Sequence, residues 1–572
     1  MVTVTIDGIQ VTVAEQATIM EAAESVGVRI PRLCFLKGIN EISACRVCLV
    51  EIEGRKRLMT ACNNTVEPGM VIHTNSPRVR RARRTNVQLI LSQHDCRCAV
   101  CVRSGNCALQ TLSNDLGCIG NPYKDHIERT PWDESFGLIR DNAKCIKCMR
   151  CIQICDKVQT LNVWDVCNTG SRTTVNVANG RSIHQAHCSL CGQCITHCPV
   201  GALRERDDTD KVLAALHDPD VITVVQVAPA VRAAWGERFG LEPGVANEKR
   251  LAAILRHMGF NYVFDTNFGA DLTIMEESAE FVHRLTHPGE APMPMFTSCC
   301  PGWMRFAKSE YPELLPHIST CKSPQQMFGA VTKSYFAQKL GVEPRRICCV
   351  SIMPCTAKKA EVTLPGMDSA GAGQDVDFAL TTRELERMIR AEAIQPHRMP
   401  EGEFDMPLGE YTGAGVIFGA TGGVMEAALR TAYKMVTGKN PDPDVFYKVR
   451  GMQPWKEAQF NVGGTVVRTA VVHGLGNTRT LIEAMKRGEV EYDFVEVMAC
   501  PGGCVGGGGQ PIHDGEEYAQ RRAPVLYQLD REKPVRFSHD NAQIVRLYEE
   551  FLGQPGSALA HELLHVDHQA QG

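Results

Sequence analysis

The sequence predicts a multidomain protein of mixed class, α+β in its amino-terminal part and α/β in its carboxy-terminal part. Three observations lead to this expectation. The chain has 572 residues, several times the ~150 residues of a typical domain. Eighteen of its 26 cysteines lie between Cys34 and Cys198. Beyond about residue 210, apolar runs alternate with helical segments, which is the pattern of sheets covered by helices.

The composition excludes several classes of protein. Apolar residues make up 44% and charged residues 22% of the chain, ordinary globular values that argue against long disordered or fibrous segments. The net charge of -4 gives no reason to expect nucleic acid as a partner. The first residues do not resemble a secretory leader, and no apolar run reaches the ~18 residues of a membrane span. We therefore expect a soluble, cytoplasmic chain, in which clustered cysteines are metal ligands far more often than disulfides.

Residues 1–78 are predicted to form a small β-rich domain. Alternating runs on either side of Asp7-Gly8 predict a hairpin, and residues 17–27 have a helical periodicity that ends at Gly27. The cysteines that follow have the spacing C-x10-C-x2-C-x13-C, which resembles plant-type [2Fe-2S] ferredoxins and implies their β-grasp fold. A small zinc site is the alternative. The predicted ligands are Cys34, Cys45, Cys48 and Cys62.

Residues 79–125 carry a second candidate metal centre with the spacing H-x3-C-x2-C-x5-C. Zinc would accept the same three thiolates and one imidazole, so the spacing alone leaves the metal open. The neighbouring iron–sulfur patterns favour a histidine-ligated [4Fe-4S] cluster. The predicted ligands are His94, Cys98, Cys101 and Cys107, and Cys96 in the same loop is a competing ligand.

Residues 126–209 contain two C-x2-C-x2-C-x3-C runs, the pattern of bacterial two-cluster ferredoxins. In those proteins the fourth cysteine of each run binds the other cluster. The internal duplication disfavours zinc fingers. We therefore predict two [4Fe-4S] clusters, one held by Cys145, Cys148, Cys151 and Cys198, and the other by Cys188, Cys191, Cys194 and Cys155.

Residues 210–572 are predicted to form an α/β catalytic domain. Ligand sites in such folds gather beyond the carboxyl ends of strands. Three cysteine motifs follow predicted strands in this way: TSCCPGW at residues 297–303, MPCTAKK at residues 353–359 and MACPGGC at residues 498–504.

The order of the predicted clusters resembles both the large iron–sulfur subunit of respiratory NADH dehydrogenases and the [FeFe] hydrogenases. The three later motifs resemble the TSCCPxW, MPCxxKxxE and ExMxCxGGCxxGGG signatures of [FeFe] hydrogenases, with Glu361 and Glu496 completing the second and third. Similar segments cover essentially the whole chain, so it resembles a multi-cluster, clostridial-type hydrogenase. This resemblance implies a two-lobed catalytic domain that holds the H-cluster.

The resemblance also implies the ligands of that cofactor. The H-cluster is a [4Fe-4S] cubane joined to a diiron subsite that carries CO, cyanide and a dithiolate with a bridgehead amine. One [2Fe-2S] cluster and three further [4Fe-4S] clusters would form the electron path that leads to it. The implied cubane ligands are Cys300, Cys355, Cys500 and Cys504, with Cys504 bridging to the diiron subsite.

The same resemblance implies a proton path. Cys299 would be the proton donor, although a free cysteine is more often a small buried apolar residue. Glu277, Glu280 and Arg284 share one helical face by their spacing and match the relay of the family, in which Ser319 bridges the glutamates. An ordinary exposed ion pair between Glu280 and Arg284 is the alternative.

The remaining pocket residues are also implied by the resemblance. Lys358 would offer its ammonium group to a cyanide ligand. Apolar side chains would keep the diiron subsite dry, although plain core packing is their alternative. Ala230 stands where some relatives carry serine, which removes one hydroxyl donor. The other implied pocket residues are Met353, Met498, Phe418, Gln325, Pro229 and Ala228.

The leading function is an [FeFe] hydrogenase that exchanges electrons between H2 and ferredoxin. The alternative is the catalytic subunit of a multimeric NAD(P)-linked hydrogenase, including electron-bifurcating types, in which other subunits bind flavin and NAD(P). Cys299 argues against a hydrogen sensor, and the complete motifs argue against an iron–sulfur assembly factor. Maturation proteins would have to insert the diiron subsite.

Several other features receive no function from the sequence. The HELLH run at residues 561–565 matches a zinc protease motif but lies too near the end of the chain for a protease cleft. The glycines between residues 413 and 423 lack the context of a nucleotide site. No role is assigned to Cys96, Cys118, Cys167, Cys321, Cys348 or Cys349.

Overall fold

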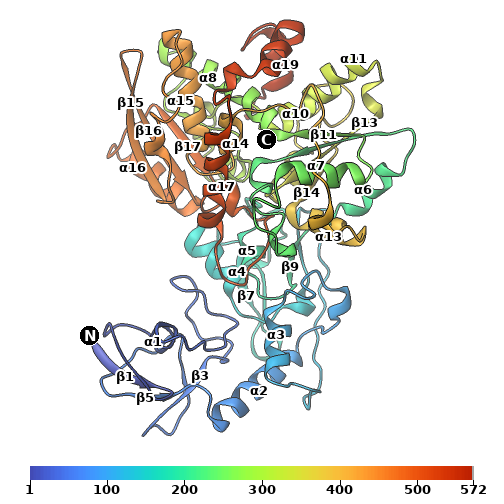
Figure 1. Ribbon diagram of the computed structural model, residues 1–572. Coiled ribbons are helices and arrows are strands. Elements are labelled where there is room, and N and C mark those ends of the chain that lie inside the picture. The colour runs from blue at the N-terminus through green and yellow to red at the C-terminus, as the bar shows by residue number, and fades with distance from the viewer. Residues whose placement is uncertain (570–572) are drawn as a thin grey trace. The chain divides into compact units, whose positions relative to one another are not determined.

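The computed structural model describes residues 1–569, which fall into two compact units (Figure 1). The amino-terminal unit comprises residues 1–158, 162–186 and 193–204. The carboxy-terminal unit comprises residues 159–161, 187–192 and 205–569. Every helix in this described part of the chain is too short or too polar to cross a bilayer.

The amino-terminal unit begins with the predicted hairpin. Strands β1 (Val2–Ile6) and β2 (Ile9–Val13) pair in antiparallel fashion. Asp7 and Gly8 between them have φ angles of 48° and 86°, the left-handed conformations that an Asp-Gly turn adopts readily. Strand β5 (Val71–His73) joins β1 in parallel, and β3 (Leu49–Ile52) and β4 (Met59–Thr60) complete a five-stranded sheet of order β2-β1-β5-β3-β4.

Helix α1 (Ile19–Ser25) confirms the predicted helix of this first domain. Thr18 and Glu21 form a capping box, and the buried residues Ile19 and Met20 pack into the core beneath the sheet. The rest of the unit contains short elements: α2 (Pro77–Leu91), α3 (Ala108–Asp115), α4 (Arg150–Gln153), β7 (Trp164–Cys167), β8 (Thr174–Val177) and α5 (Gln193–Thr196).

The carboxy-terminal unit is built on two four-stranded sheets. The first has the order β11-β10-β13-β14 and is fully parallel. Its strands carry apolar runs because a parallel sheet is covered by helices on both faces, and every residue of β13 is buried. They are β10 (Ile222–Val227), β11 (Tyr262–Asp265), β13 (Ile347–Met353) and β14 (Phe378–Thr381).

The second sheet has the order β12-β17-β16-β15, in which only β15 runs antiparallel to its neighbour. The α/β class predicted for this part of the chain is therefore confirmed. The strands are β12 (Met295–Phe296), β15 (Trp455–Val462), β16 (Thr465–His473) and β17 (Phe494–Met498).

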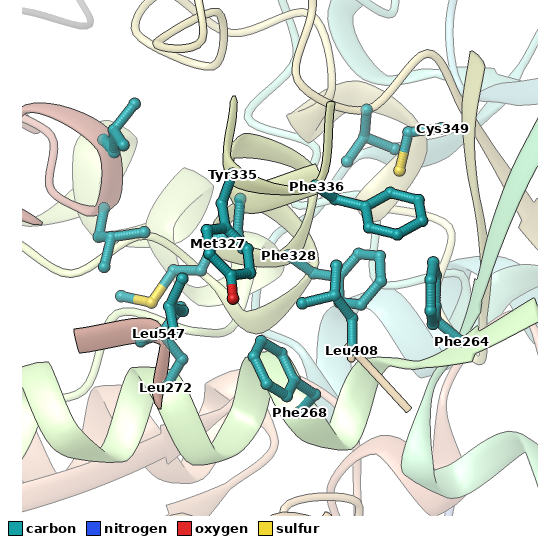
Figure 2. Close-up of a cluster of buried hydrophobic side chains, with 14 of the residues drawn as sticks. Phe264, Phe268, Leu272, Met327, Phe328, Tyr335, Phe336, Cys349, Leu408 and Leu547 are labelled. Atoms are coloured by element: carbon teal, nitrogen blue, oxygen red, sulfur yellow. The ribbon is translucent and has the colours of Figure 1, made fainter. Parts of the chain in front are cut away.

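Helix α8 (Thr266–Thr286) is the central helix of this unit and packs against α10 (Pro324–Val331), α14 (Gly413–Ile417) and α15 (Gly423–Thr437). Gly269 permits the contact with α10, because a Cβ atom there would lie 2.4 Å from the carbonyl oxygen of Pro324. Figure 2 shows the aromatic cluster beside this contact. The ring of Phe328 lies 6.4 Å from that of Phe268 and 5.9 Å from that of Phe264. Each such ring contributes about 1.5–3 kcal/mol by burial, so this packing stabilises the contact between α8 and α10.

A buried ion network joins α15 to α17 (Ala519–Glu532). The guanidinium of Arg430 is fully buried and donates to both carboxylate oxygens of Asp530, at 3.0 and 2.9 Å. Arg536 donates to the same carboxylate at 3.1 and 2.7 Å. Burial opposes ionisation, but these hydrogen bonds outweigh it and hold the pKa of Asp530 below its usual value.

Replacing Asp530 with alanine should destabilise the carboxy-terminal unit by about 3 kcal/mol, because it breaks a buried ion pair and leaves the buried Arg430 guanidinium with one carboxylate partner, Glu426, in place of two. Denaturant unfolding followed by circular dichroism measures the loss. Glu532→Ala is the matched control, since Glu532 is exposed near the end of the same helix. Equal unfolding midpoints for the two variants would contradict the importance of this network.

Candidate active site

The three cysteine motifs meet at one cavity in the carboxy-terminal unit. They follow β12, β13 and β17 directly, so the cavity lies beyond the carboxyl ends of strands from both sheets. All four predicted cubane ligands line it: Cys300, Cys355, Cys500 and Cys504.

The chemistry of these four thiols fits an iron–sulfur cluster. Burial, and then the neighbouring thiol of Cys300, raise the pKa of Cys355 to about 12. Burial likewise raises the pKa of Cys500 and Cys504. Four thiolates around one cavity would repel one another, whereas a cationic metal centre compensates their charges. The backbone N–H of Ala499 also points to the sulfur of Cys300 at 3.4 Å.

The glycines of the last motif bring the loops close together. A Cβ atom at Gly507 would lie 2.1 Å from the carbonyl oxygen of Pro354, and one at Gly508 would lie 2.3 Å from that of Cys191. Gly503 has a φ of 86°, which also favours glycine. These glycines therefore allow one loop to pack closely against another.

The side chains predicted to surround the diiron subsite line the same cavity. Ala230 lies there as well, and its methyl group offers no hydrogen bond. The other predicted pocket residues in the lining are Ala228, Pro229, Gln325, Met353, Lys358, Phe418 and Met498.

Lys358 supplies a buried cation at the cavity wall. Its Nζ donates to Glu361 at 2.9 Å and lies 3.4 Å from the carbonyl oxygen of Cys299. Burial alone would lower the pKa of Lys358, but the Glu361 carboxylate and the nearby thiols outweigh burial and raise it. The ammonium group therefore stays charged.

Glu361 has a larger role than the sequence revealed. One of its oxygens accepts hydrogen bonds from Ser323 at 3.0 Å, from Gln325 at 3.0 Å and from Lys358 at 2.9 Å. It therefore fixes two cavity side chains at once. The i,i+3 spacing of Lys358 and Glu361 is the signal that could have indicated this pair.

Glu496 holds the last cysteine loop in place. Its carboxylate accepts hydrogen bonds from the backbone N–H groups of Gly422 at 2.6 Å and Met425 at 2.8 Å, at the start of α15. Burial raises the pKa of Glu496, although these amides oppose the shift. A carboxylate suits the positive end of a helix, which explains a buried glutamate two residues before Met498.

The predicted proton path lies on α8 beside the cavity. Cys299 is buried and lines the cavity. Burial, and then the charge of Glu277, raise the pKa of its thiol well above the usual value. Ser319 donates to Glu280 at 2.8 Å, and Arg284 donates to the other oxygen of Glu280 at 2.5 Å.

Glu277 is the most unusual group of this path. Its side chain is fully buried, and neither carboxylate oxygen has a hydrogen-bond partner of normal geometry among residues 1–569. Burial, and then the charge of Glu280, raise the pKa of Glu277 to about 8, while the nearby Ser319 hydroxyl opposes this shift. The carboxyl group is therefore neutral at pH 7 and able to give up a proton close to that pH.

The Glu280–Arg284 ion pair exists, but it is not the exposed pair considered as the alternative. The side chain of Arg284 is only 5% exposed. Its guanidinium also donates to the carbonyl oxygens of His317 at 3.2 Å and Ile318 at 3.1 Å. Arg284 therefore fixes the position of Glu280.

The four predicted [2Fe-2S] ligands come together in the amino-terminal unit. A hydrogen bond with Cys34 lowers the pKa of Cys45 to about 6 and raises that of Cys34. Cys62 similarly lowers the pKa of Cys48, and the two pairs lie close enough to interact electrostatically. When one thiol donates a hydrogen bond to its neighbour, the neighbour ionises more easily to the thiolate, which is the form that binds a metal.

The second candidate centre has a suitable histidine. His94 is buried, and its Nδ1 lies 3.0 Å from the carbonyl oxygen of Lys144. Metal-bound histidines commonly donate the other ring nitrogen in this way, which leaves Nε2 for the metal. Cys96, the competing ligand, lies with its thiol 3.3 Å from the carbonyl oxygen of His94. The thiols of Cys101 and Cys107 are near enough to interact.

One of the two predicted [4Fe-4S] ligand sets lines a single cavity in the amino-terminal unit. It consists of Cys145, Cys148, Cys151 and Cys198. Cys198 comes from the second cysteine run, as the exchanged pattern requires. The other set is divided between the units, with Cys155 and Cys194 in one and Cys188 and Cys191 in the other. Its pairing stays a prediction.

Comparison with known proteins identifies related families along the chain. Residues 221–508 match the family described as iron only hydrogenase large subunit, C-terminal domain. Residues 516–571 match the iron hydrogenase small subunit. The other matches are a 2Fe-2S iron-sulfur cluster binding domain at residues 1–77, an NADH-ubiquinone oxidoreductase-G iron-sulfur binding region at residues 83–119 and a 4Fe-4S binding domain at residues 182–204.

Two relatives match almost the whole length of this chain. The chain is 46% identical to the NADP-reducing hydrogenase subunit HndD of Solidesulfovibrio fructosivorans, over 99% of this chain and 98% of that protein. It is 39% identical to iron hydrogenase 1 of Clostridium pasteurianum, over 100% of both chains. A solved structure of the [FeFe]-hydrogenase HydA1 from Chlamydomonas reinhardtii has a TM-score of 0.57 at 44% identity, covering 63% of this chain and 98% of that one.

Proposed function

Because this chain belongs to the iron-only, or [FeFe], hydrogenase family, we propose that its carboxy-terminal cavity is the place where protons and electrons combine to H2 and where H2 is split. The observation that carries this assignment is the convergence of three motifs on one buried cavity. Four thiols, the ammonium group of Lys358 and the thiol of Cys299 all line it.

We propose that Cys300, Cys355, Cys500 and Cys504 hold the cubane of the H-cluster. When bound, this cofactor supplies a redox-active diiron site with CO, cyanide and a dithiolate, at which H2 is formed or split. Lys358 offers its charged ammonium group to an anionic cyanide. Met353, Met498 and Phe418 exclude water from the cavity, since all three are buried.

The proton path is proposed to run through Cys299, Glu277, Ser319 and Glu280, with Arg284 as the positioning residue. The two glutamates contribute to this path in different ways. Glu277 holds a proton at pH 7 because its pKa is about 8, and Glu280, which is partly exposed, connects the path towards solvent. General acid–base groups work best when their pKa lies near the working pH.

We propose that residues 1–78, 79–125 and 126–209 form three successive iron–sulfur domains and that residues 210–572 form the catalytic domain. The matured chain should then hold about 20 iron atoms, from one [2Fe-2S] cluster, four [4Fe-4S] clusters and the diiron subsite. Metal analysis of the purified protein measures this number. A His94→Ala variant should lose about four irons. Stoichiometric zinc in place of four of the 20 irons in the unsubstituted protein would remove the His94 cluster from the electron path.

The catalytic assignment is tested by H2 production from a chemically reduced dye. The chain matured by the proteins that build the diiron subsite should be active. The same chain with its iron–sulfur clusters but without the diiron subsite should be inactive. A fully matured chain, with infrared bands of metal-bound CO and cyanide but no H2 turnover, would refute the assignment.

Two electron partners are proposed. One is ferredoxin. The other is a set of NAD(P)- and flavin-binding subunits, which the 46% identity to an NADP-reducing hydrogenase subunit over almost the whole chain favours. Purification from the native cells, followed by assays of H2-dependent reduction of ferredoxin and of NADP+, separates the two. Cytoplasmic localisation belongs to the same proposal and is tested by cell fractionation.

A further inference from the structure

Three potential metal ligands lie beside the outer end of the proposed proton path. They are Glu280, Cys321 and His565, and their ligand atoms all lie within 4.8 Å of one another. The sulfur of Cys321 is 3.9 Å from Oε2 of Glu280 and 4.0 Å from Nδ1 of His565. The sequence patterns assign no function to Cys321 or to the HELLH run that contains His565.

The ring of His565 is held as metal-binding histidines are held. Its Nε2 lies 3.0 Å from a carboxylate oxygen of Glu276. Glu276 is itself fixed by the hydroxyl of Tyr548 at 2.5 Å and the backbone N–H of Gly556 at 2.8 Å. A histidine that donates one ring nitrogen to a carboxylate presents the other to a metal. Nδ1 of His565 is therefore the ring nitrogen that faces Cys321 and Thr320.

Thr320 offers a fourth potential ligand atom, and the cluster is exposed to solvent on one side. The hydroxyl of Thr320 lies 2.8 Å from Nδ1 of His565 and 3.3 Å from Oε2 of Glu280. The side chain of Glu280 is 14% exposed, whereas Cys321 is fully buried. The cluster is therefore partly accessible to solvent at Glu280 and buried at Cys321.

A second cluster of potential ligands in the described chain is less suited to bind a metal ion. Glu426, Asp444 and Asp530 also lie close together. Their charges are already neutralised by Arg430 and Arg450, and by further arginine contacts to Asp530 and Asp444. In the first cluster Glu280 is also paired with an arginine, Arg284, but the other two groups are a thiol and an imidazole, which are stronger ligands for a borderline metal.

We propose that Glu280, Cys321 and His565 form an inhibitory site for Zn2+. One thiolate, one imidazole and one carboxylate are typical zinc ligands, and Thr320 or a water molecule would complete a tetrahedron. Binding releases the thiol proton of Cys321 to solvent. The effect on turnover depends on the proposed function: zinc occupies the carboxylate of Glu280 and its charge repels protons, so the proton path is interrupted while the cofactor stays intact.

The test uses the matured holoprotein, whose cluster cysteines are occupied, and Zn2+ as the probe. Equilibrium dialysis should show one additional zinc per chain, and X-ray absorption at the zinc edge should show one sulfur neighbour. H2 production should fall as this site fills and recover after EDTA is added. Mg2+ should have no effect, because this hard cation prefers oxygen ligands.

Variants locate the site. Cys321→Ser and His565→Gln should each weaken zinc inhibition at least about tenfold, relative to the zinc-free rate of the same variant, and Glu276→Gln should weaken it about 10–100-fold. Cys348→Ser and His561→Gln are the matched controls, because they remove another buried cysteine and the exposed histidine that stacks on His565. Both controls should retain the inhibition, and equal iron content shows that each variant is folded.

Unchanged zinc binding in a Cys321→Ser, His565→Gln double variant would overturn this proposal. The zinc count and the zinc-edge spectrum do not depend on turnover. If the protein bound zinc here but made no H2, only the proposed function would fail. If it made H2 but bound no zinc at these residues, only the zinc site would fail.

Discussion

Replacing Cys299 with alanine is expected to reduce H2 production by about 10²–10⁴-fold, the usual contribution of a positioned acid–base group. The substitution removes an ionisable thiol from the cavity but leaves Cys300, Cys355, Cys500 and Cys504 in place. The infrared bands of metal-bound CO and cyanide should therefore persist. The measurement is the ratio of H2 turnover to the intensity of these bands.

Cys348→Ala is the matched control for this experiment. Cys348 is also a buried cysteine, but it lies in β13 within the hydrophobic core and not at the cavity. It should retain turnover. Near-normal turnover of Cys299→Ala would show that protons bypass this thiol, and loss of the infrared bands would show that Cys299 has a structural role instead.

Replacing Glu277 with glutamine should also reduce H2 production by about 10²–10⁴-fold. Glutamine has almost the shape of the protonated carboxyl group but cannot carry a proton. Because Glu277 is neutral at pH 7, the substitution should leave the fold and the cofactor intact. H2 turnover per diiron subsite is the measurement, and retained turnover would remove Glu277 from the proton path.

The difference in stability between Glu277→Gln and the unsubstituted protein should depend on pH. The pKa of Glu277 is about 8 in the folded protein, above its ordinary value of 4.5. Between these two values the unfolded chain releases a proton that the folded chain keeps, so the unsubstituted protein loses up to about 1.4 kcal/mol of stability per pH unit. Glutamine has no such loss. The thermal midpoint of Glu277→Gln should therefore rise relative to the unsubstituted protein from pH 5 to pH 8 and change no further above it.

Glu386 provides a matched control that separates burial from proton transfer. It lies in α13 (Thr382–Ala391), is buried, and burial raises its pKa to about 8 as well. Glu386→Gln should show the same trend of stability with pH but normal H2 turnover. If both variants lost turnover equally, the loss could not be assigned to the proton path.

The sequence predicted those features that depend on local patterns. The core strand β13 was recognised because a strand buried on both faces is a continuous apolar run. Helix α13 has a helical periodicity in the sequence, and Thr381 and Glu384 form its capping box. The three cysteine motifs were placed at strand ends, and the structure brings them to one cavity.

The start of α8 is not evident in the sequence. A helical periodicity is clear only from Asp271, but the helix begins at Thr266, immediately after β11, with Asp265 as its N-cap. Gly269 weakens the helical pattern in this turn. The structure keeps the glycine because α10 approaches at that point, a tertiary constraint that a single sequence does not display.

Contacts between segments far apart in the chain could not be predicted from the sequence either. His565 and Glu276 are far apart in the chain, and nothing in the composition of either segment indicates that they meet. Asp530 and Arg430 are similarly separated. Glu361 and Glu496 were recognised only as members of motifs, and their hydrogen bonds emerged from the fold. Such partners depend on how the sheets pack, which local patterns leave undetermined.

The position of the four cavity thiols has a consequence for folding. Cys355 follows a strand of one sheet, whereas Cys300 and Cys500 follow strands of the other. A metal cluster bound to all of them would act as a cross-link that closes two long loops, and such links remove entropy chiefly from the unfolded chain. Cluster insertion should therefore be a late assembly step that locks the two sheets together, and oxidative loss of the cluster would loosen the architecture as well as stop catalysis.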